Sequence, residues 1–499
     1  MSGRLCQERR DRRVTLDSDG DGGFRGILRE ASSHVREERF YRAVVKSGGD
    51  RAAEAAFNLG HVLERQGRIR QARAAYQLAI DSGHREWAPA AAVSLGKFAA
   101  EQGDFEAARA AWQYAIDSGH SEYASTAALN LGILRGREGD VPGAEAAYRR
   151  AAGSGHPELA AAAANNLGKL LLEAGDLDGA GSAFRQAIGF GHPKWSAAAA
   201  ISLGVMLRQQ GDIRGAQAAY EQAMDFQDDQ SSPNAAYNLG NLLEQQGDIP
   251  GARAWFQRAV DSGHPQHAPN AAYNLGNLLS GNEADAEQAR AAYELAISFG
   301  DAEIAPKAAF NLGNLLRNQG DLHAAASAYG QADISGHPDL APMGARALGI
   351  VLAKQGEFIE ASAAYQRAID SRHPDIAPRA ALNLGNLLNG QGDFNRARAA
   401  YQQAIGSRHP DVAPSAAFSL GVMLQVHGDF SGARAAYQQA IESRHSHYAP
   451  VAATALGIML QEQGDFKAAR ANYQRAIESG HADAASEARK RLPTLPDAR

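Results

Sequence analysis

Apolar positions recur along the chain at helical spacing, and residues 233–268 show the pattern most clearly. Two apolar sets follow one another there: Tyr237, Leu239, Leu242 and Leu243, then Ala252, Phe256, Ala259 and Val260. Between the sets, Gly247 can end a helix in the left-handed conformation and Asp248 can cap the next helix. A Ser-Gly-His stretch at 262–264 ends the second set. The pattern predicts a hairpin of two helices, and no strand signal accompanies it.

The same hairpin pattern recurs at a fixed interval. A Leu-Gly pair marks each copy, with its glycine at Gly60, Gly96, Gly132, Gly168, Gly204, Gly240, Gly276, Gly313, Gly349, Gly385, Gly421 and Gly457. The spacing is 36 residues throughout, except for 37 between Gly276 and Gly313. Twelve copies at this period predict a solenoid of stacked units with one core running through them. Function is therefore to be sought on a repeated surface.

Three further positions are restricted in all twelve copies. The positions of Ala252 and Ala259 are always alanine, and the position of Phe256 is always aromatic. Small residues allow two helices to approach closely, and a large ring fills the space beside them. A leucine at the Ala252 position would overpack the unit at a cost of about 1–3 kcal/mol.

This combination resembles the tetratricopeptide repeat over about residues 53–481. In the copy at 236–265, Ala236 and Leu243 stand where that family usually has a large aromatic and a tyrosine, and each unit is two residues longer than usual. The resemblance implies an all-α, right-handed superhelical solenoid of helix-turn-helix repeats. It also implies a concave groove lined by the first helix of each pair, in which an extended peptide or another protein binds.

The segments outside the repeats are shorter. We expect a disordered polar tail at 1–33, a degenerate capping half-repeat at 34–52, a C-terminal capping helix at 482–492 and a short tail at 493–499. Terminal caps are needed because the end units of a solenoid would otherwise expose core.

Asparagines are concentrated on one face of the first helices in the middle units. The candidate groove residues are Asn234, Tyr237, Asn238, Asn241, Asn270, Tyr273, Asn274, Asn277, Lys307, Phe310, Asn311, Asn314, Asn383 and Asn386. A carboxamide carries both donors and an acceptor, so a ladder of asparagines can pair with a peptide backbone of any sequence. The alternative is that these side chains satisfy local polar groups or face water. A carboxylate-gripping groove looks incomplete, because Lys307 and Arg379 are the only obvious cations at matching inner positions.

Histidines also form a column, at His84, His120, His156, His192, His264, His337, His373, His409, His445 and His481. Packed helices lie about 8–10 Å apart, whereas zinc needs ligands at about 2.0–2.1 Å, so successive members cannot share an ion. We expect these histidines in the turns after each hairpin. Arg372, Arg408 and Arg444 replace the glycine that precedes the earlier ones. Because arginine is strained in the left-handed region, we expect those three turns to differ in shape.

Composition narrows the function further. A net charge of −6 argues against nucleic-acid binding, and a single cysteine, Cys6, allows neither an internal disulfide nor a cysteine zinc site. No apolar run approaches the length of a membrane span and the N-terminus lacks a secretory signal, so we expect a cytoplasmic protein. With no phosphate loop and no convergent catalytic set, we expect a non-enzymatic interaction scaffold without metal or cofactor. A self-assembling scaffold is the alternative, and an RNA-binding helical repeat is less favoured.

Overall fold

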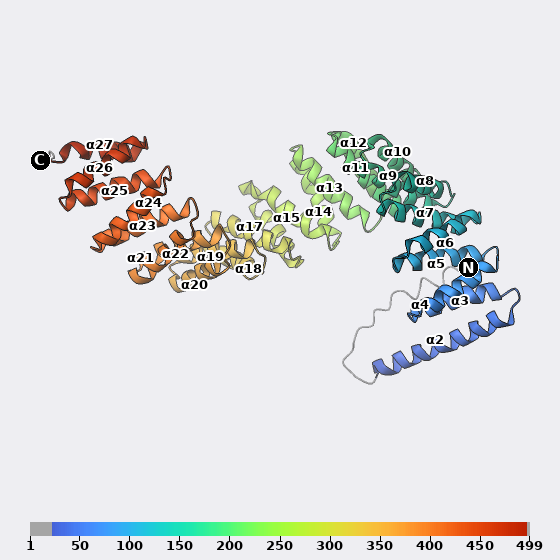
Figure 1. Cartoon of the computed structure of the whole chain (residues 1–499). Coiled ribbons are helices and arrows are strands. Elements are labelled where there is room, and N and C mark those ends of the chain that lie inside the picture. The colour runs from blue at the N-terminus through green and yellow to red at the C-terminus, as the bar shows by residue number, and fades with distance from the viewer. Residues whose placement is uncertain (1–21, 497–499) are drawn as a thin grey trace. The chain divides into compact units, whose positions relative to one another are not determined.

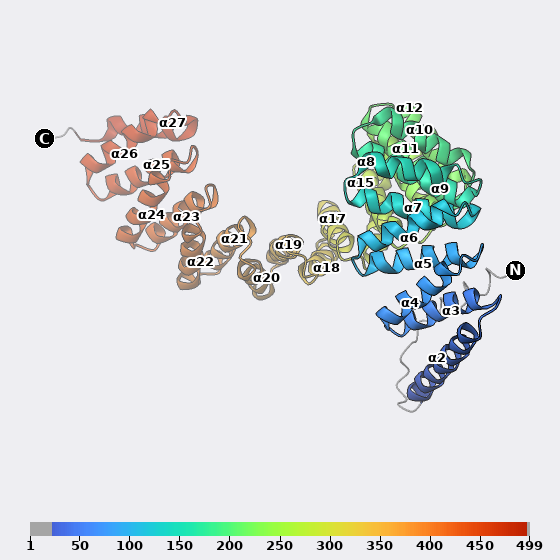
Figure 2. The same cartoon turned by 45° about the vertical axis from the view of Figure 1, so that its right-hand side comes forward.

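The computed structural model describes residues 22–496, with side chains described from residue 35 onward. The described chain contains 26 α-helices, two 3₁₀ helices and no strand. It divides between Ala235 and Ala236 into two compact units, and the boundary falls inside helix α13 (Ser231–Gln245). Within each unit the helices follow one another as stacked hairpins (Figure 1), and a second view shows the same order (Figure 2). The all-α solenoid predicted from the repeat is confirmed.

The N-terminal unit holds one leading helix and five complete hairpins. Its helices are α2 (Gly22–Ser47), α3 (Ala52–Arg65), α4 (Ile69–Asp81), α5 (Trp87–Glu101), α6 (Phe105–Asp117), α7 (Ser121–Arg137), α8 (Val141–Ala152), α9 (Pro157–Glu173), α10 (Leu177–Gly189), α11 (Pro193–Gln209) and α12 (Ile213–Asp225).

The C-terminal unit begins within α13 and ends with a single helix. Its elements are α14 (Ile249–Asp261), α15 (His267–Ser280), η1 (Glu283–Asp285), α16 (Ala286–Ser298), α17 (Ile304–Asn318), α18 (Leu322–Asp333), α19 (Leu340–Gln355), α20 (Phe358–Asp370), α21 (Ile376–Gly390), α22 (Phe394–Gly406), α23 (Val412–Val426), α24 (Phe430–Glu442), α25 (Tyr448–Glu462), α26 (Phe466–Glu478), α27 (Ala482–Arg491) and η2 (Leu492–Thr494). The 3₁₀ turn η1 lies in the hairpin with the 37-residue spacing, between its two helices.

The first helix differs from the sequence-based boundary. Helix α2 begins at Gly22 rather than near residue 34, so residues 22–33 are helical and not part of a disordered tail. Residues 28–31 are Leu-Arg-Glu-Ala, which all favour helix, so the helix continues toward the N-terminus. Tyr41 and Val45 of α2 pack against the first hairpin's core at Leu59, Leu63, Ala72, Ala75 and, in α5, Phe98. Residues 1–21 and 497–499 of the two expected tails, with Cys6, lie outside the described residues.

The glycine of each Leu-Gly pair lies directly against the aromatic side chain of its own hairpin. A Cβ atom added to Gly240 would lie 2.5 Å from the Phe256 ring, and the nearest ring atom is 2.4–2.7 Å away across all twelve glycines. Any side chain at these positions would displace the ring. The repeated glycine therefore serves close packing between the two helices of a hairpin.

The short connections follow the expected chemistry. Gly247 has a φ of 78°, and the Asp248 side chain accepts the backbone N–H of Gly251 at 3.0 Å. The expectation of differently shaped arginine turns is wrong, because Arg372, Arg408 and Arg444 have φ values of 56°, 57° and 55°, as the glycines of other units do. The same serine-to-histidine contacts surround both kinds of turn and hold the same backbone shape.

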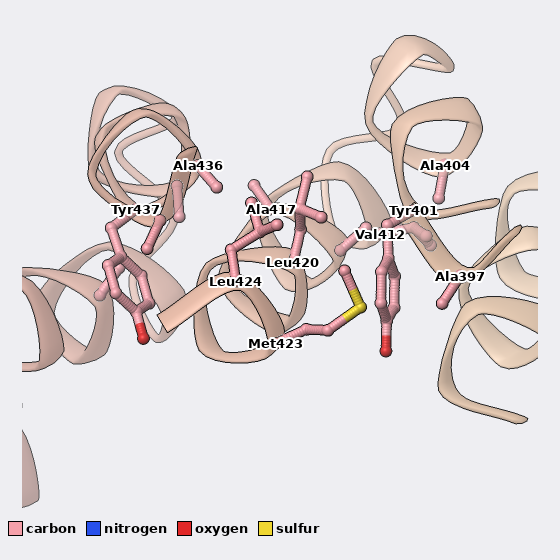
Figure 3. Close-up of a cluster of buried hydrophobic side chains, with 14 of the residues drawn as sticks. Ala397, Tyr401, Ala404, Val412, Ala417, Leu420, Met423, Leu424, Ala436 and Tyr437 are labelled. Carbon is pink, nitrogen blue, oxygen red and sulfur yellow. The ribbon is translucent and has the colours of Figure 1, made fainter. Parts of the chain in front are cut away.

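Tyrosines, alanines and aliphatic side chains make up the core of the C-terminal unit. In Figure 3, Met423 of α23 extends toward the ring of Tyr401, and Leu424 lies on the side of Tyr437. Tyr401 and Tyr437 are each 1% exposed, and the invariant alanines beside them are fully buried. Each first helix is thus covered by the second helices on both of its sides, which is how stacked repeats share one core.

Candidate functional site

The first helices of successive hairpins line the inner face of the C-terminal unit. α15 contacts α17, and the same contact recurs in order through α25 and α27. In the described part of this unit, no second helix contacts the second helix of the next hairpin. A stack in which one row of helices touches and the other splays apart curves toward the touching row. The candidate asparagines lie on that inner row.

The first rung of the asparagine ladder joins α13 to α15. The Nδ2 group of Asn274 donates to Oδ1 of Asn241 at 2.8 Å and approaches the Tyr237 hydroxyl at 3.4 Å. All three side chains are half-buried. Tyr237 also packs near the Phe256 ring of its own hairpin, with the ring centroids 6.3 Å apart.

The second rung repeats this arrangement between α15 and α17. Nδ2 of Asn311 donates to Oδ1 of Asn277 at 2.9 Å and to the Tyr273 hydroxyl at 3.2 Å. The hydroxyl of Tyr293, from the second helix of the same hairpin, donates to the same Asn277 oxygen at 2.8 Å. Burial raises the pKa of Tyr293, so its hydroxyl stays protonated and able to donate. The ladder therefore links neighbouring hairpins. In this respect the carboxamides satisfy polar groups of the chain itself, which is part of the alternative to peptide binding.

Each rung leaves part of its hydrogen-bonding capacity on the inner face. The Oδ1 atom of Asn277 accepts two hydrogens, whereas its Nδ2 group donates to no described residue. Conversely, Nδ2 of Asn311 is used and its Oδ1 accepts from no described residue. In the first rung, Asn241 likewise uses its Oδ1 atom and Asn274 its Nδ2 group, whereas Nδ2 of Asn241 and Oδ1 of Asn274 bond to no described residue. Donors and acceptors thus alternate along a half-buried row.

The other predicted groove residues lie at different distances from this row. Asn234 falls in the N-terminal unit, Asn238 is half-buried on α13, and Asn270 donates to the Gln266 carbonyl of its own chain segment at 2.7 Å. Asn314 and Asn386 accept the hydroxyls of Tyr329 and Tyr401 at 2.7 and 2.8 Å. Burial raises the pKa of Tyr401 to about 12, which keeps that hydroxyl a donor.

The ladder stops in the hairpin of α19 and α20. Arg346, Ala347 and Ile350 stand there at the positions of Tyr273, Asn274 and Asn277, so Asn383 in the next hairpin finds no asparagine to pair with. Arg346 lies on the inner row and is half-buried. The sequence analysis missed this cation, although aligning the copies on their glycines places it in the column of Tyr237, Tyr273 and Phe310.

The two predicted cations have local acidic partners. Lys307 lies 3.7 Å from Glu303, one helical turn away, and Arg379 pairs with Asp375 at 3.0 Å. Asp375 also contacts His409 at 2.9 Å, and the hydrogen bonds from His409 and Arg379 lower its pKa. Phe310 packs near Tyr329, with ring centroids 5.6 Å apart.

The histidine column has a structural role in the turns. Nδ1 of His373 accepts the backbone N–H groups of Asp375 and Ile376, at 3.3 and 3.2 Å, and so caps α21. Its Nε2 atom faces Asp339 of the preceding hairpin at 3.4 Å. The placement of these histidines in turns is confirmed. Among the residues with described side chains, no three histidine, cysteine or acidic groups are placed to share a metal ion.

Several solved structures are similar to this chain at low sequence identity. No helix in the described part of the chain is both long and apolar enough to cross a bilayer. The chain is similar to the solved structure of c5321, a protective antigen present in uropathogenic Escherichia coli strains with an SLR fold; the identity is 18%, the match covers 93% of this chain and 98% of that one, and the TM-score is 0.40. It is also similar to the solved structure of BtubC from P. vanneervenii, with 18% identity over 46% of this chain and 95% of that one and a TM-score of 0.32. Pseudomonas aeruginosa pilF is similar over 42% of this chain and 91% of its own, with 17% identity and a TM-score of 0.32. No curated protein matches.

The family comparison covers most of the chain. The tetratricopeptide repeat model matches eight regions, most of which overlap a neighbour, namely residues 37–91, 57–128, 93–157, 129–198, 202–268, 346–412, 382–446 and 418–484. The stretch between 268 and 346, which holds most of the asparagine ladder, lies between two of these matches. The chain belongs to the tetratricopeptide repeat family, whose solenoids generally act as non-catalytic scaffolds for protein interaction.

Proposed function

We propose that the inner face of the C-terminal unit binds an extended segment of another protein through the backbone of that segment. The observation that carries the proposal is the alternation of unused Nδ2 donors on Asn241 and Asn277 with unused Oδ1 acceptors on Asn274 and Asn311. A peptide backbone offers the complementary groups, one N–H and one C=O per residue. The ladder bonds hold each carboxamide in a fixed orientation, so less side-chain entropy is lost on binding.

The spacing of the rungs suits an extended chain. Contacting helices lie about 8–10 Å apart, and an extended peptide rises about 3.3 Å per residue. One rung would therefore meet the ligand at about every third residue. Tyr273 and Phe310, both half-buried, offer apolar contact between rungs. Recognition of this kind depends on backbone shape and tolerates many sequences.

The sharpest test changes the unused donors without breaking the ladder. Asn241→Asp and Asn277→Asp together keep the oxygen that accepts the ladder bonds and replace each free donor by an acceptor. A second variant, Asn238→Ala with Asn274→Ala and Asn311→Ala, removes the row itself. Immobilised full-length chain would capture proteins from lysate of its source cells, and mass spectrometry would quantify their recovery. We expect both variants to lose most of the captured partners while circular dichroism shows unchanged helix content.

The control carries three substitutions on the outer face of the same hairpins. Gln257→Ala, Glu294→Ala and Gln331→Ala alter exposed residues of α14, α16 and α18 and should leave recovery unchanged. Wild-type recovery by both inner-face variants would refute the proposal.

A further inference from the structure

The last α-helix, α27, lies where a first helix would begin another hairpin, and no second α-helix follows it in the described chain. It packs on α26 and α25 at the end of the C-terminal unit (Figure 1). Its buried side chains are the three alanines Ala484, Ala485 and Ala488, whereas α25 buries leucines and a methionine. Because stabilisation by burial grows with the apolar area removed from water, α27 is held more weakly than the complete hairpins.

A histidine before each first helix of this unit connects that helix to the preceding hairpin. Its Nδ1 atom accepts backbone N–H groups of the helix that follows, as His373 does for α21. In four successive hairpins its Nε2 atom faces a carboxylate, at 3.5 Å for His337 and Glu303, 3.4 Å for His373 and Asp339, 2.9 Å for His409 and Asp375, and 3.6 Å for His445 and Asp411. A proton on any of these four rings would therefore meet a counter-charge.

The contact that joins α27 to the last hairpin is different. His447 occupies the position of those carboxylates, and its Nδ1 atom lies 2.9 Å from Nε2 of His481. The Nδ1 atom of His481 accepts the backbone N–H of Ala484 at 3.3 Å and so caps α27. Because that nitrogen acts as an acceptor, the neutral ring of His481 carries its hydrogen on Nε2 and donates it to His447. Both contacts thus depend on neutral rings.

A proton on either ring removes one of these contacts. On His481 it would occupy the nitrogen that caps α27, and on His447 it would place two N–H donors opposite each other. Release of α27 separates the rings and allows each of them to take up a proton, so acid favours release. Uptake of two protons increases the release equilibrium by up to about a hundredfold for each pH unit below the ordinary histidine pKa of about 6.5.

The groups around the two rings supply no counter-charge. Glu478 at the end of α26 and Asp483 in α27 are exposed, and no ion pair joins either of them to these rings in the described part of the chain. In the turn before α25, His445 accepts the backbone N–H of His447 at 3.1 Å, which adds a third titratable ring. On α25, the Tyr448 ring lies edge-on to the His447 ring. Protonation of the pair is therefore uncompensated.

We propose that the pair of His447 and His481 is a pH-sensitive latch, which holds α27 on the last hairpin at neutral pH and releases it in mild acid. Release uncovers the end of the apolar core to which Ala488 and Leu495 belong. The C-terminal cap of the solenoid is then removable, whereas the histidines of the preceding hairpins keep their carboxylate partners. This inference does not depend on the function proposed for the inner face.

Hydrogen–deuterium exchange of the full-length chain at pH 8 and at pH 5 tests the latch. Each exchange rate is compared with that of an unstructured peptide at the same pH, because amide exchange itself depends on pH. In the wild type, the protection of residues 482–491 should fall at least about tenfold between pH 8 and pH 5. The protection of α21, whose histidine faces Asp339, should change by less than about threefold and is the reference within the unit.

Two variants each place one carboxylate opposite one imidazole. His447→Asp restores the type of side chain that faces the histidine in the four preceding hairpins. His481→Asp introduces the side chain that already caps α17, where Asp301 accepts the backbone N–H groups of Glu303 and Ile304 at 2.9 Å. Both variants should protect α27 as the wild type does at pH 8 and should keep that protection at pH 5.

His427→Gln is the matched control. It removes a histidine of the same unit whose ring lies against Phe394, and the neighbouring hairpins carry Gln391 and Gln463 at this position. This variant should show the acid response of the wild type.

Unchanged protection of α27 between pH 8 and pH 5 in the wild type would overturn the proposal. An equal loss of protection in the wild type and in both carboxylate variants would also overturn it, because release would then not depend on the pair. If one carboxylate variant fails to protect α27 even at pH 8, the other variant decides the outcome.

Discussion

A Cβ atom on Gly313 would lie 2.6 Å from the ring of Tyr329, whose hydroxyl donates to Asn314 at 2.7 Å. Asn314, which follows Gly313 in the chain, thus accepts a hydrogen bond from the hydroxyl of the same ring that packs against Gly313. The same relationship joins Gly276, Asn277 and Tyr293 in the preceding hairpin. Glycine and asparagine in the repeated motif are therefore both tied to the placement of one buried ring.

Replacing Gly313 by alanine should destabilise the C-terminal unit by about 1–3 kcal/mol, because the added methyl group overpacks the hairpin. The loss outweighs the roughly 1 kcal/mol that alanine gains over glycine in a helix. Gly330→Ala, in α18 of the same hairpin, is the control, because nothing lies within 4 Å of its added Cβ and stability should rise. Urea unfolding followed by circular dichroism measures both. A Gly313→Ala variant as stable as the control would contradict the packing argument.

Two tyrosines at equivalent positions should respond oppositely to loss of the hydroxyl. The Tyr220 hydroxyl is buried without a described partner, whereas that of Tyr329 donates to Asn314. Tyr220→Phe should therefore raise stability by about 1 kcal/mol, and Tyr329→Phe should lower it by about the same amount. Phenylalanine already occupies this position at Phe184 and Phe256, so the ring itself fits. Thermal unfolding of both variants measures these changes in stability. A Tyr220→Phe variant less stable than the wild type would show that the Tyr220 hydroxyl is hydrogen-bonded in solution.

Asn165 of α9 is fully buried, and neither its Nδ2 nor its Oδ1 atom has a described partner. The neighbouring hairpins carry Leu129 and Ile201 at the same position. Asn165→Leu should therefore stabilise the N-terminal unit by about 1–3 kcal/mol, since an unsatisfied polar group leaves the interior. Asn274→Leu is the contrasting change and should destabilise, because it removes the bond to Asn241. Denaturant midpoints compare the two, and a destabilising Asn165→Leu would point to a buried water bound there.

The repeat pattern predicted the hairpins, their caps and the inner face because those features follow from local spacing. Gly247 and Asp248 act as their residue types suggest, and the invariant alanines at the Ala252 position are fully buried. The ladder bonds were beyond the sequence, because Asn274 and Asn241 are 33 residues apart and the register of their helices decides which atoms meet. Arg346 was missed for a similar reason, since whether its Nε atom finds a hydrogen-bond partner among the described residues depends on which side chains surround it.

The three arginine turns show how a correct rule led to a wrong expectation. Arginine does avoid the left-handed region, yet Arg408 adopts a φ of 57° because the contacts on either side of it fix the turn. The backbone N–H of His409 donates to the Ser407 hydroxyl oxygen at 3.1 Å, and the Nδ1 atom of His409 accepts the backbone N–H groups of Asp411 and Val412. Those contacts are repeated at the glycine turn of His337.

The cost of that backbone conformation can be measured by exchanging the two residue types. Arg408→Gly should raise the stability of the C-terminal unit by about 1–2 kcal/mol, because glycine adopts positive φ without steric strain. The reciprocal change, Gly263→Arg, meets no atom within 4 Å of the added Cβ, so it should lower stability by a similar amount through the backbone alone. Urea unfolding of the single variants tests both directions. If Arg408→Gly is no more stable than the wild type, the arginine side chain makes a compensating contact that offsets its strain.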